Sequence, residues 1–167
     1  RRGEQPRSRP RSVSEPDVAR SFVVVDDQLA LLAALQILPV APDTTIVTTY
    51  GWQQRILGAF AAPRATEGHL QRIAAGASMT AAAVIEAIGS PKEQHLTIAD
   101  PRATAVDIAR ARVSGTNSLA AETIAAAQSY GAVVRVSVGN STGHVAERVG
   151  RAGLDLAVWD PFPSSPA

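Results

Sequence analysis

SFVVVDDQLALLAAL, residues 21–35, is the stretch of sequence that decides the expected fold. It opens with a short β-branched run, residues 22–25, and changes after Asp26 and Asp27 to leucines at near-helical spacing. Such a run favours a buried strand, and the leucine spacing favours a helix with an apolar face. The stretch therefore predicts a buried strand that leads directly into a helix.

The same strand-and-helix unit repeats along the chain. Residues 44–49 (TTIVTT) form a second β-favouring run, and the apolar residues from Trp52 to Phe60 recur on one helical face. Residues 63–91 suit two helices joined near Gly76. Because parallel strands need crossover connections, this alternation implies parallel pairing. We therefore expect a three-layer α/β/α sandwich with a mostly parallel central sheet.

The second half of the chain continues the alternation. Residues 95–99 (HLTIA) form a short run whose pairing into the sheet stays open. In a helix expected over 104–113, we place Val106, Ile108 and Ala109 on the inward face. The remaining expected elements are a helix capped by Asn117 or Ser118 that stops at Gly131, a strand over 133–138, a helix that ends at Gly153 and a strand over 154–159.

Length and composition favour a single domain, which we place at residues 21–161. The chain has 167 residues, 46% of them hydrophobic, which suffices for one ordinary core. It has no cysteine, which excludes disulfides, thiolate metal sites and a cysteine nucleophile. No run approaches the roughly 18 apolar residues of a membrane span. These features lead us to expect a cytoplasmic protein with no membrane partner.

The charges are distributed unevenly along the chain. Residues 1–20 carry six arginines and three acidic residues, a net charge of +3, whereas residues 21–167 carry ten basic and twelve acidic residues, a net charge of −2. We expect 1–20 to be a disordered basic tail and 162–167 a disordered C-terminal tail, because neither has much to bury. The basic tail is either an arm that touches nucleic acid or an upstream extension with no such role.

Ligands of parallel sheets gather outside the carboxyl ends of the strands. This rule directs attention to polar residues near the expected strand ends, above all Asp26 and Asp27. Carboxylates gathered there would bind a hard cation such as Mg²⁺ or Mn²⁺, which metal-assisted phosphodiester hydrolysis requires. The alternative is that the two aspartates only cap the following helix. The complete set is Asp26, Asp27, Thr48, Thr49, Asp100, Gly139, Asn140 and Asp160.

The order of these elements resembles that of PIN-domain proteins, which include the ribonuclease toxins of bacterial toxin–antitoxin pairs. The segments that carry the resemblance are VVVDDQLALLAAL, VTTYGWQQRILGAF, SLAAETIAAAQSYGAVVRVSVGN and LDLAVW, within residues 22–159. The VVDD and TT..W..R segments look closer to small PIN-like proteins of high-G+C bacteria. The resemblance implies Mg²⁺- or Mn²⁺-dependent RNA cleavage in which a metal-bound water attacks the phosphodiester. It also implies RNA, an antitoxin protein and a second copy of the chain as partners.

The resemblance assigns roles to individual acids. Asp26 matches the aspartate that ends the first strand in the family, and Asp27 beside it supplements the site or caps the helix. The family's third acid falls on Ala121 or Glu122, depending on register. We therefore expect Asp26 and Glu122 to be catalytic, and Asp26, Asp27 and Glu122 to bind the metal. Glu122 is otherwise a solvated helix residue.

Two of the family's acids are replaced by amides in this chain. Gln54 stands at the position of the second acid and Asn140 at that of the fourth. An amide oxygen ligates a cation without the negative charge that holds it against water, so we expect a weakened acidic site. The extreme case is a catalytically inactive PIN-like module that binds RNA or protein.

Four residues are assigned to substrate binding: Thr49, Trp52, Arg55 and Asn140. Trp52 and Arg55, three residues apart on one expected helix, suit a nucleobase and a phosphate. The alternative for Trp52 is packing in the core. Residues 139–143 (GNSTG) either cradle a phosphate or form a tight turn with Ser141 or Thr142 as a cap. If they bind phosphate, the chain could instead be an unrelated α/β nucleotide-binding domain.

Overall fold

The structure is a computed structural model that describes residues 20–61 and 68–162. The predicted disordered tails lie outside the described residues except for their innermost positions, Arg20 and Phe162. The described part is an α/β protein with a five-stranded sheet, and all of the strand pairs are parallel.

The sheet has the strand order β3-β2-β1-β4-β5, so the first strand lies at its centre. In register, Val23 of β1 lies beside Ile46 of β2 on one side and Val133 of β4 on the other. The strands are β1 (Ser21–Val25), β2 (Thr44–Thr49), β3 (Thr97–Ala99), β4 (Val133–Val136) and β5 (Leu156–Val158). The central position of β1 explains why an apolar β-branched run is needed there.

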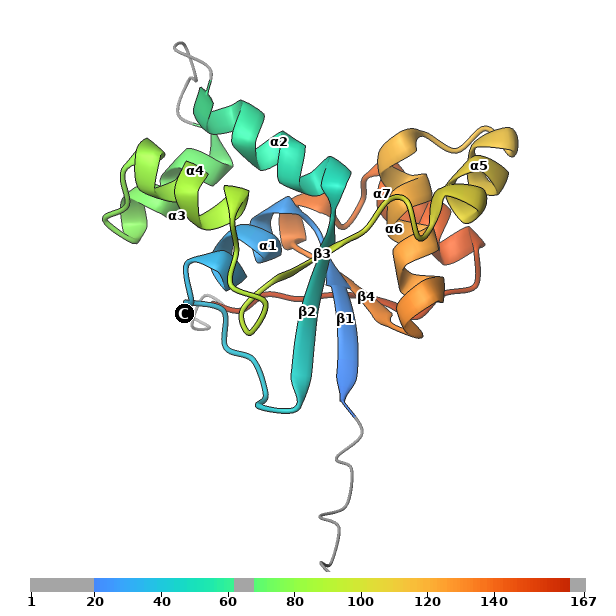
Figure 1. Ribbon diagram of the computed structural model, residues 1–167, viewed down its shortest axis with the longest axis horizontal. Coiled ribbons are helices and arrows are strands. Elements are labelled where there is room, and N and C mark those ends of the chain that lie inside the picture. The colour runs from blue at the N-terminus through green and yellow to red at the C-terminus, as the bar shows by residue number, and fades with distance from the viewer. Residues whose placement is uncertain (1–19, 62–67, 163–167) are drawn as a thin grey trace, which may run out of the picture.

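Helices cover both faces of this sheet, which makes the three layers (Figure 1). Val23 and Val25 belong to a core cluster with α1, α3 and α4, whereas Val24 belongs to a second cluster with α6 and α7. This split follows the two-residue period of a strand. The helices are α1 (Asp27–Ala34), α2 (Tyr50–Ala61), α3 (His69–Gly76), α4 (Ala81–Gly89), α5 (Ala105–Val113), α6 (Ser118–Tyr130) and α7 (His144–Arg151), with a 3₁₀ turn, η1 (Val138–Asn140).

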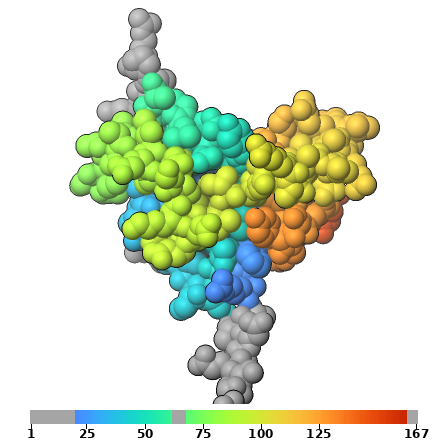
Figure 2. Space-filling model, viewed as in Figure 1, coloured from blue at the N-terminus to red at the C-terminus, as the bar shows by residue number. Residues whose placement is uncertain are grey.

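The space-filling view shows two lobes separated by a notch (Figure 2). Helices α2 to α4 form one lobe, and α5 with the start of α6 forms the other. Since Figure 1 shows β1 and β2 running towards this end of the molecule, the notch lies at the carboxyl edge of the sheet. This is the edge at which parallel sheets bind ligands.

The structure resolves one open question and corrects one expectation. Thr97–Ala99 does pair into the sheet, with Ile98 beside Thr48 of β2. The inward face predicted for α5 is wrong: Val106 is 64% exposed, Ala109 is exposed and Ile108 is only half-buried. The helix packs mainly on α6 and buries none of its own residues, because it lies outside the layer that covers the sheet.

The ends of α6 are as the sequence predicts. The Asn117 side chain accepts a hydrogen bond from the Ala120 amide, and the helix ends at Gly131 in the left-handed conformation, with φ of 58°. The strand expected over 133–138 is shorter, since β4 ends at Val136 and Val138 begins η1. The Ser137 amide between them donates to Asp26. The chain therefore leaves the sheet at Ser137, where its backbone amide binds the Asp26 side chain instead of a neighbouring strand.

No single helix in the described ranges has both the length and the apolar composition that crossing a membrane requires. The bent pair α3 and α4, with 100° between its helices, meets that test by length and composition alone. Both helices of the pair bury side chains in the first core cluster, α3 through Leu70 and Ala74 and α4 through Val84 and Ile88.

Candidate functional site

The strand order reverses between the carboxyl ends of β1 and β4, and we refer to this point as the β1–β4 crevice. The connection after β1 leads to α1 on one face of the sheet, and the connection after β4 leads to α7 on the other. Such a point, where the strand order reverses, is where open α/β sheets bind ligands. Asp26 follows β1 and Ser137 follows β4, so these two residues flank the crevice.

Asp26 joins the two sides of this crevice. Its side chain is buried at 1% exposure, and its Oδ1 accepts a hydrogen bond from the Leu29 amide at 3.1 Å, which caps α1. Its Oδ2 accepts bonds from the Ser137 amide and hydroxyl, both at 2.6 Å, and from Asn140 Nδ2 at 2.9 Å. Asp26 is therefore a helix cap, as the alternative proposed, and also the bridge from β1 to the loop after β4.

Asp27 lies beside it and is also buried, at 3% exposure. Its Oδ1 accepts hydrogen bonds from the Gln28 amide and from Asn140 Nδ2, both at 2.9 Å, and its Oδ2 lies 3.1 Å from Arg55 Nε. Burial raises the pKa of Asp27 above its usual value, and the neighbouring Asp26 charge raises it further, whereas Arg55 and the two hydrogen bonds lower it. The folded protein thus holds the ionised form of Asp27 at a cost.

Asn140 spans the two aspartates. Its amide nitrogen donates to Asp26 Oδ2 and Asp27 Oδ1, at 2.9 Å each. With Leu29, Ser137, Gln28 and Arg55, it gives every oxygen of the aspartate pair (Asp26 and Asp27) a donor. A divalent cation binding here would have to displace some of these donors.

Glu122 has a different local partner. Its Oε2 accepts a hydrogen bond from the Gly51 amide at 2.7 Å, at the N-terminus of α2, where a carboxylate is favourable. A Cβ on Gly51 would lie 2.9 Å from Leu119 Cδ1 and 3.0 Å from Glu122 Oε2, so only glycine fits without rearrangement. Of the two register candidates, Ala121 is fully buried, whereas Glu122 is half-buried.

Within residues 20–61 and 68–162, no three carboxylate or histidine side chains group closely enough to hold a metal ion. The structure brings together Asp26, Asp27, Asn140 and Arg55, and bonds Glu122 to the start of α2 instead. The three predicted metal ligands therefore do not form one cluster: Asp26 and Asp27 lie together, and Glu122 lies apart from them.

The residues assigned to substrate binding differ in accessibility. Trp52 is 2% exposed, and its Nε1 donates to Thr123 Oγ1 at 3.1 Å, so its assignment to a nucleobase is corrected to packing. Thr49 is also buried, and its Oγ1 accepts from the Trp52 amide at 3.4 Å. Gln54 is exposed on α2. Arg55 contacts Asp27, yet its side chain is 56% exposed, so it is also accessible to a ligand.

Sequence reasoning missed Ser137, which lies directly after a strand end and makes two hydrogen bonds to Asp26. Its place at the end of a strand could have indicated a site residue, but Ser137 lies inside the segment 133–138 that was predicted to be a strand. The segment 139–143 forms part of η1 and a turn. Gly143 is the N-cap residue of α7 and provides no side-chain cap, so neither Ser141 nor Thr142 caps this helix. A Cβ on Gly139 would lie 2.7 Å from Gln28 Nε2, so a larger residue there would displace the end of the Gln28 side chain.

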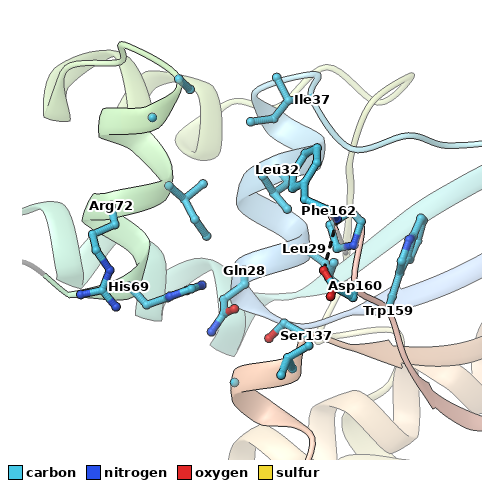
Figure 3. Close-up of a pocket in the computed structure, with 16 residues that line it drawn as sticks. Gln28, Leu29, Leu32, Ile37, His69, Arg72, Ser137, Trp159, Asp160 and Phe162 are labelled. Carbon is cyan, nitrogen blue, oxygen red and sulfur yellow. Dashed lines mark hydrogen bonds between the residues drawn. The ribbon is translucent and has the colours of Figure 1, made fainter. Parts of the chain in front are cut away.

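A cavity of about 900 Å³ adjoins the crevice (Figure 3). Ser137, which binds Asp26, lies on its wall, and so does Gln28 of α1. Figure 3 shows His69 and Arg72 of α3 on one side and Trp159 and Asp160 on the other, with Leu29 and Leu32 between them. A largely apolar cavity with a few polar groups is typical of a site for a ligand or for a partner's side chains.

The raised pKa of Asp27 gives a testable pH dependence. A group with a raised folded pKa binds protons more tightly in the folded state, so its contribution to stability is largest at low pH and falls as pH rises through that pKa. In a chelating buffer, we expect the unfolding free energy of the wild type, minus that of Asp27→Asn, to decrease from pH 4 to pH 8. Urea unfolding at several pH values measures this difference. A flat or rising difference contradicts the expectation.

Fold and site together define a three-layer α/β protein with a buried aspartate pair at the point where the strand order reverses. Comparisons of the chain with family models, with curated proteins and with solved structures find no match.

Proposed function

We propose that this chain is a cytoplasmic PIN-like domain protein of toxin–antitoxin type, a Mg²⁺- or Mn²⁺-dependent ribonuclease with a weakened acidic site. The observation that carries the proposal is the pair of adjacent buried carboxylates, Asp26 and Asp27, at the β1–β4 crevice. Two carboxylates and the Ser137 hydroxyl provide oxygen ligands of the kind that hard divalent cations prefer.

A divalent cation at this pair would supply charge that stabilises a phosphodiester under attack and would acidify a bound water. Asp26 and Asp27 would hold it, and Arg55, whose exposed guanidinium already lies beside Asp27, would bind a phosphate of the RNA. Asn140 weakens the site, because it contributes no charge and its amide nitrogen occupies both carboxylates. RNA is thus the proposed substrate, with an antitoxin and a second copy of the chain as proposed partners.

The second candidate is a catalytically inactive PIN-like module that binds RNA or protein. It is favoured by the donors that already satisfy all four oxygens of the aspartate pair, because such a pair needs no cation. The cavity beside the crevice also suits a protein partner, since Ile37, Val138 and Phe162 on its wall are 39%, 60% and 60% exposed. These apolar surfaces would be covered when such a partner binds.

Restoring the family's acid separates the two candidates. Under the nuclease proposal, Asn140→Asp replaces a competing donor with a third carboxylate, so we expect Mn²⁺ to bind at least about tenfold more tightly than in the wild type, which corresponds to ~1.4 kcal/mol. Titration calorimetry measures the affinity, and cleavage of a fluorescent oligoribonucleotide measures activity. Asn117→Asp, the same change at the cap of α6, is the matched control and should alter neither.

Asp27→Asn completes the test because it removes a charge while retaining the shape of the side chain. We expect it to abolish Mn²⁺ binding and cleavage in both the wild-type and the Asn140→Asp background. If Asn140→Asp binds no Mn²⁺ and cleaves no RNA, the nuclease proposal is wrong and the inactive module is the better description. Cleavage that persists in Asp27→Asn would exclude the aspartate pair as its cause.

A further inference from the structure

A second cavity, of about 500 Å³, lies between α5, α6 and α7. Its charged lining is three arginines, Arg110 from α5 and Arg148 and Arg151 from α7, and one acid, Asp107 from α5. The neutral polar lining consists of Ser114, Thr116 and Gln128. Gln128 lies six residues beyond Glu122 on α6, about 9 Å along the helix axis towards the amino edge of the sheet. The cavity is therefore distinct from the crevice that holds the aspartate pair.

The three arginines differ in their partners. Arg110 pairs with Asp107 at 3.1 Å, and Arg151 pairs with Glu147 at 2.6 Å; both arginines are mostly exposed. Arg148 is half-buried, and its Nε is buried without a hydrogen-bond partner among the residues that the structure describes. A buried donor left unsatisfied costs about 1–3 kcal/mol, more when it is charged. Arg148 thus brings to the cavity wall a buried N–H donor that lacks an acceptor among the described residues.

Of the neutral polar groups, only the Gln128 amide adds a donor for the same kind of ligand, because the Ser114 hydroxyl donates to the Ala111 carbonyl and the Thr116 hydroxyl donates to Ser114 Oγ. Thr116 is 7% exposed, and its hydroxyl lies 3.3 Å from Ser114 Oγ, which itself lies 2.6 Å from the Ala111 carbonyl. Guanidinium groups bind planar or tetrahedral oxyanions through paired N–H donors. A ligand with three or four oxygens matches three arginines and an amide better than a carboxylate with two oxygens does.

We propose that the cavity between α5, α6 and α7 binds a phosphate group, with Arg148 as its principal ligand and Arg110 and Arg151 at its rim. The phosphate belongs to a free phosphate or to the backbone of a polynucleotide; the chemistry at Arg148 is the same. The site does not depend on the proposed nuclease function, because none of its residues belongs to the aspartate pair or contacts it.

The test uses the full chain in a chelating buffer at constant ionic strength, with inorganic phosphate, a ten-nucleotide single-stranded RNA and sodium acetate as probes. We expect NMR titration to show phosphate and RNA binding in the wild type, and Arg148→Gln to weaken both at least about tenfold. Arg112→Gln changes an exposed arginine of α5 outside the cavity and is the matched control, expected to leave both affinities unchanged. RNA that binds much more tightly than phosphate identifies a polynucleotide backbone as the source.

Since the buried Arg148 Nε has no hydrogen-bond partner among residues 20–61 and 68–162, Arg148→Gln should unfold at the same or a higher urea concentration than the wild type. Equal affinities of the wild type and Arg148→Gln for both probes would overturn the proposal. So would acetate binding as tightly as phosphate, or a clear loss of stability in Arg148→Gln. Asp27→Asn separates this inference from the proposed function, because it should retain phosphate binding even if it loses Mn²⁺.

Discussion

Replacing Asp26 with alanine is expected to lower the free energy of unfolding by about 3 kcal/mol, from the lost helix cap and from buried donors left without an acceptor. The carboxylate caps α1 through the Leu29 amide and accepts three bonds from Ser137 and Asn140. The loss of repulsion from Asp27 offsets part of this cost. Urea denaturation in a chelating buffer measures the change.

The matched control for Asp26→Ala is Asp100→Ala. Asp100 also follows a strand and accepts a backbone hydrogen bond, from the Arg102 amide at 2.8 Å, but it is exposed and bonds only within its own turn. We expect it to cost less than ~1 kcal/mol. If Asp26→Ala costs no more than this control, the β1–β4 bridge contributes little to stability, and the placement of Asp26 at the centre of the site is incorrect.

Replacing Trp52 with alanine is expected to cost about 4 kcal/mol, the range for deleting a large buried aromatic side chain. Trp52 is among the largest side chains of the second core cluster and is 2% exposed. Its neighbour Ile56 belongs to the first cluster, so this segment of α2 connects the two cores. Trp52→Phe retains most of the apolar volume and should cost about half as much. Thermal and urea unfolding measure both.

Tyr50→Ala is the control for Trp52, because Tyr50 begins the same helix and is 48% exposed; we expect a cost below ~1 kcal/mol. The RNA affinity of Trp52→Phe should equal that of the wild type, since a base cannot stack on a ring inside the core. A selective loss of RNA affinity in a normally stable Trp52→Phe would show instead that the ring contacts RNA.

Local pattern predicted most of the elements because their signals are contained in short segments. The β-branched run at 22–25, the cap at Asn117 and the stop at Gly131 all read correctly. The pattern was wrong for α5, where the apolar residues expected to face inward are exposed or only half-buried. Periodicity indicates which side chains share a face, but it does not show whether another layer covers that face. The layer order is a property of the whole fold.

The candidate site, too, was partly predictable from local sequence and partly not. Asp26 and Asp27 were found from sequence because they directly follow a strand of a parallel sheet. The partners of Asp26 across the crevice, Ser137 and Asn140, lie 111 and 114 residues further along the chain. Glu122 was expected to join Asp26. Instead, its carboxylate accepts a hydrogen bond from the amide of Gly51, which lies 71 residues earlier in the chain. Only the packing of α6 against α2 determines that contact.

By itself, the sequence determined the three-layer α/β architecture and the end of the sheet where chemistry should be sought, because both follow from local periodicity and from the geometry of parallel strands. The tertiary structure decided which side chains meet: the amide of Asn140 between two aspartates, Trp52 inside the core, and Arg148 Nε without a hydrogen-bond partner in the described part of the chain. Such contacts join residues that are distant along the chain. They depend on crossover directions and helix packing, which no short segment encodes.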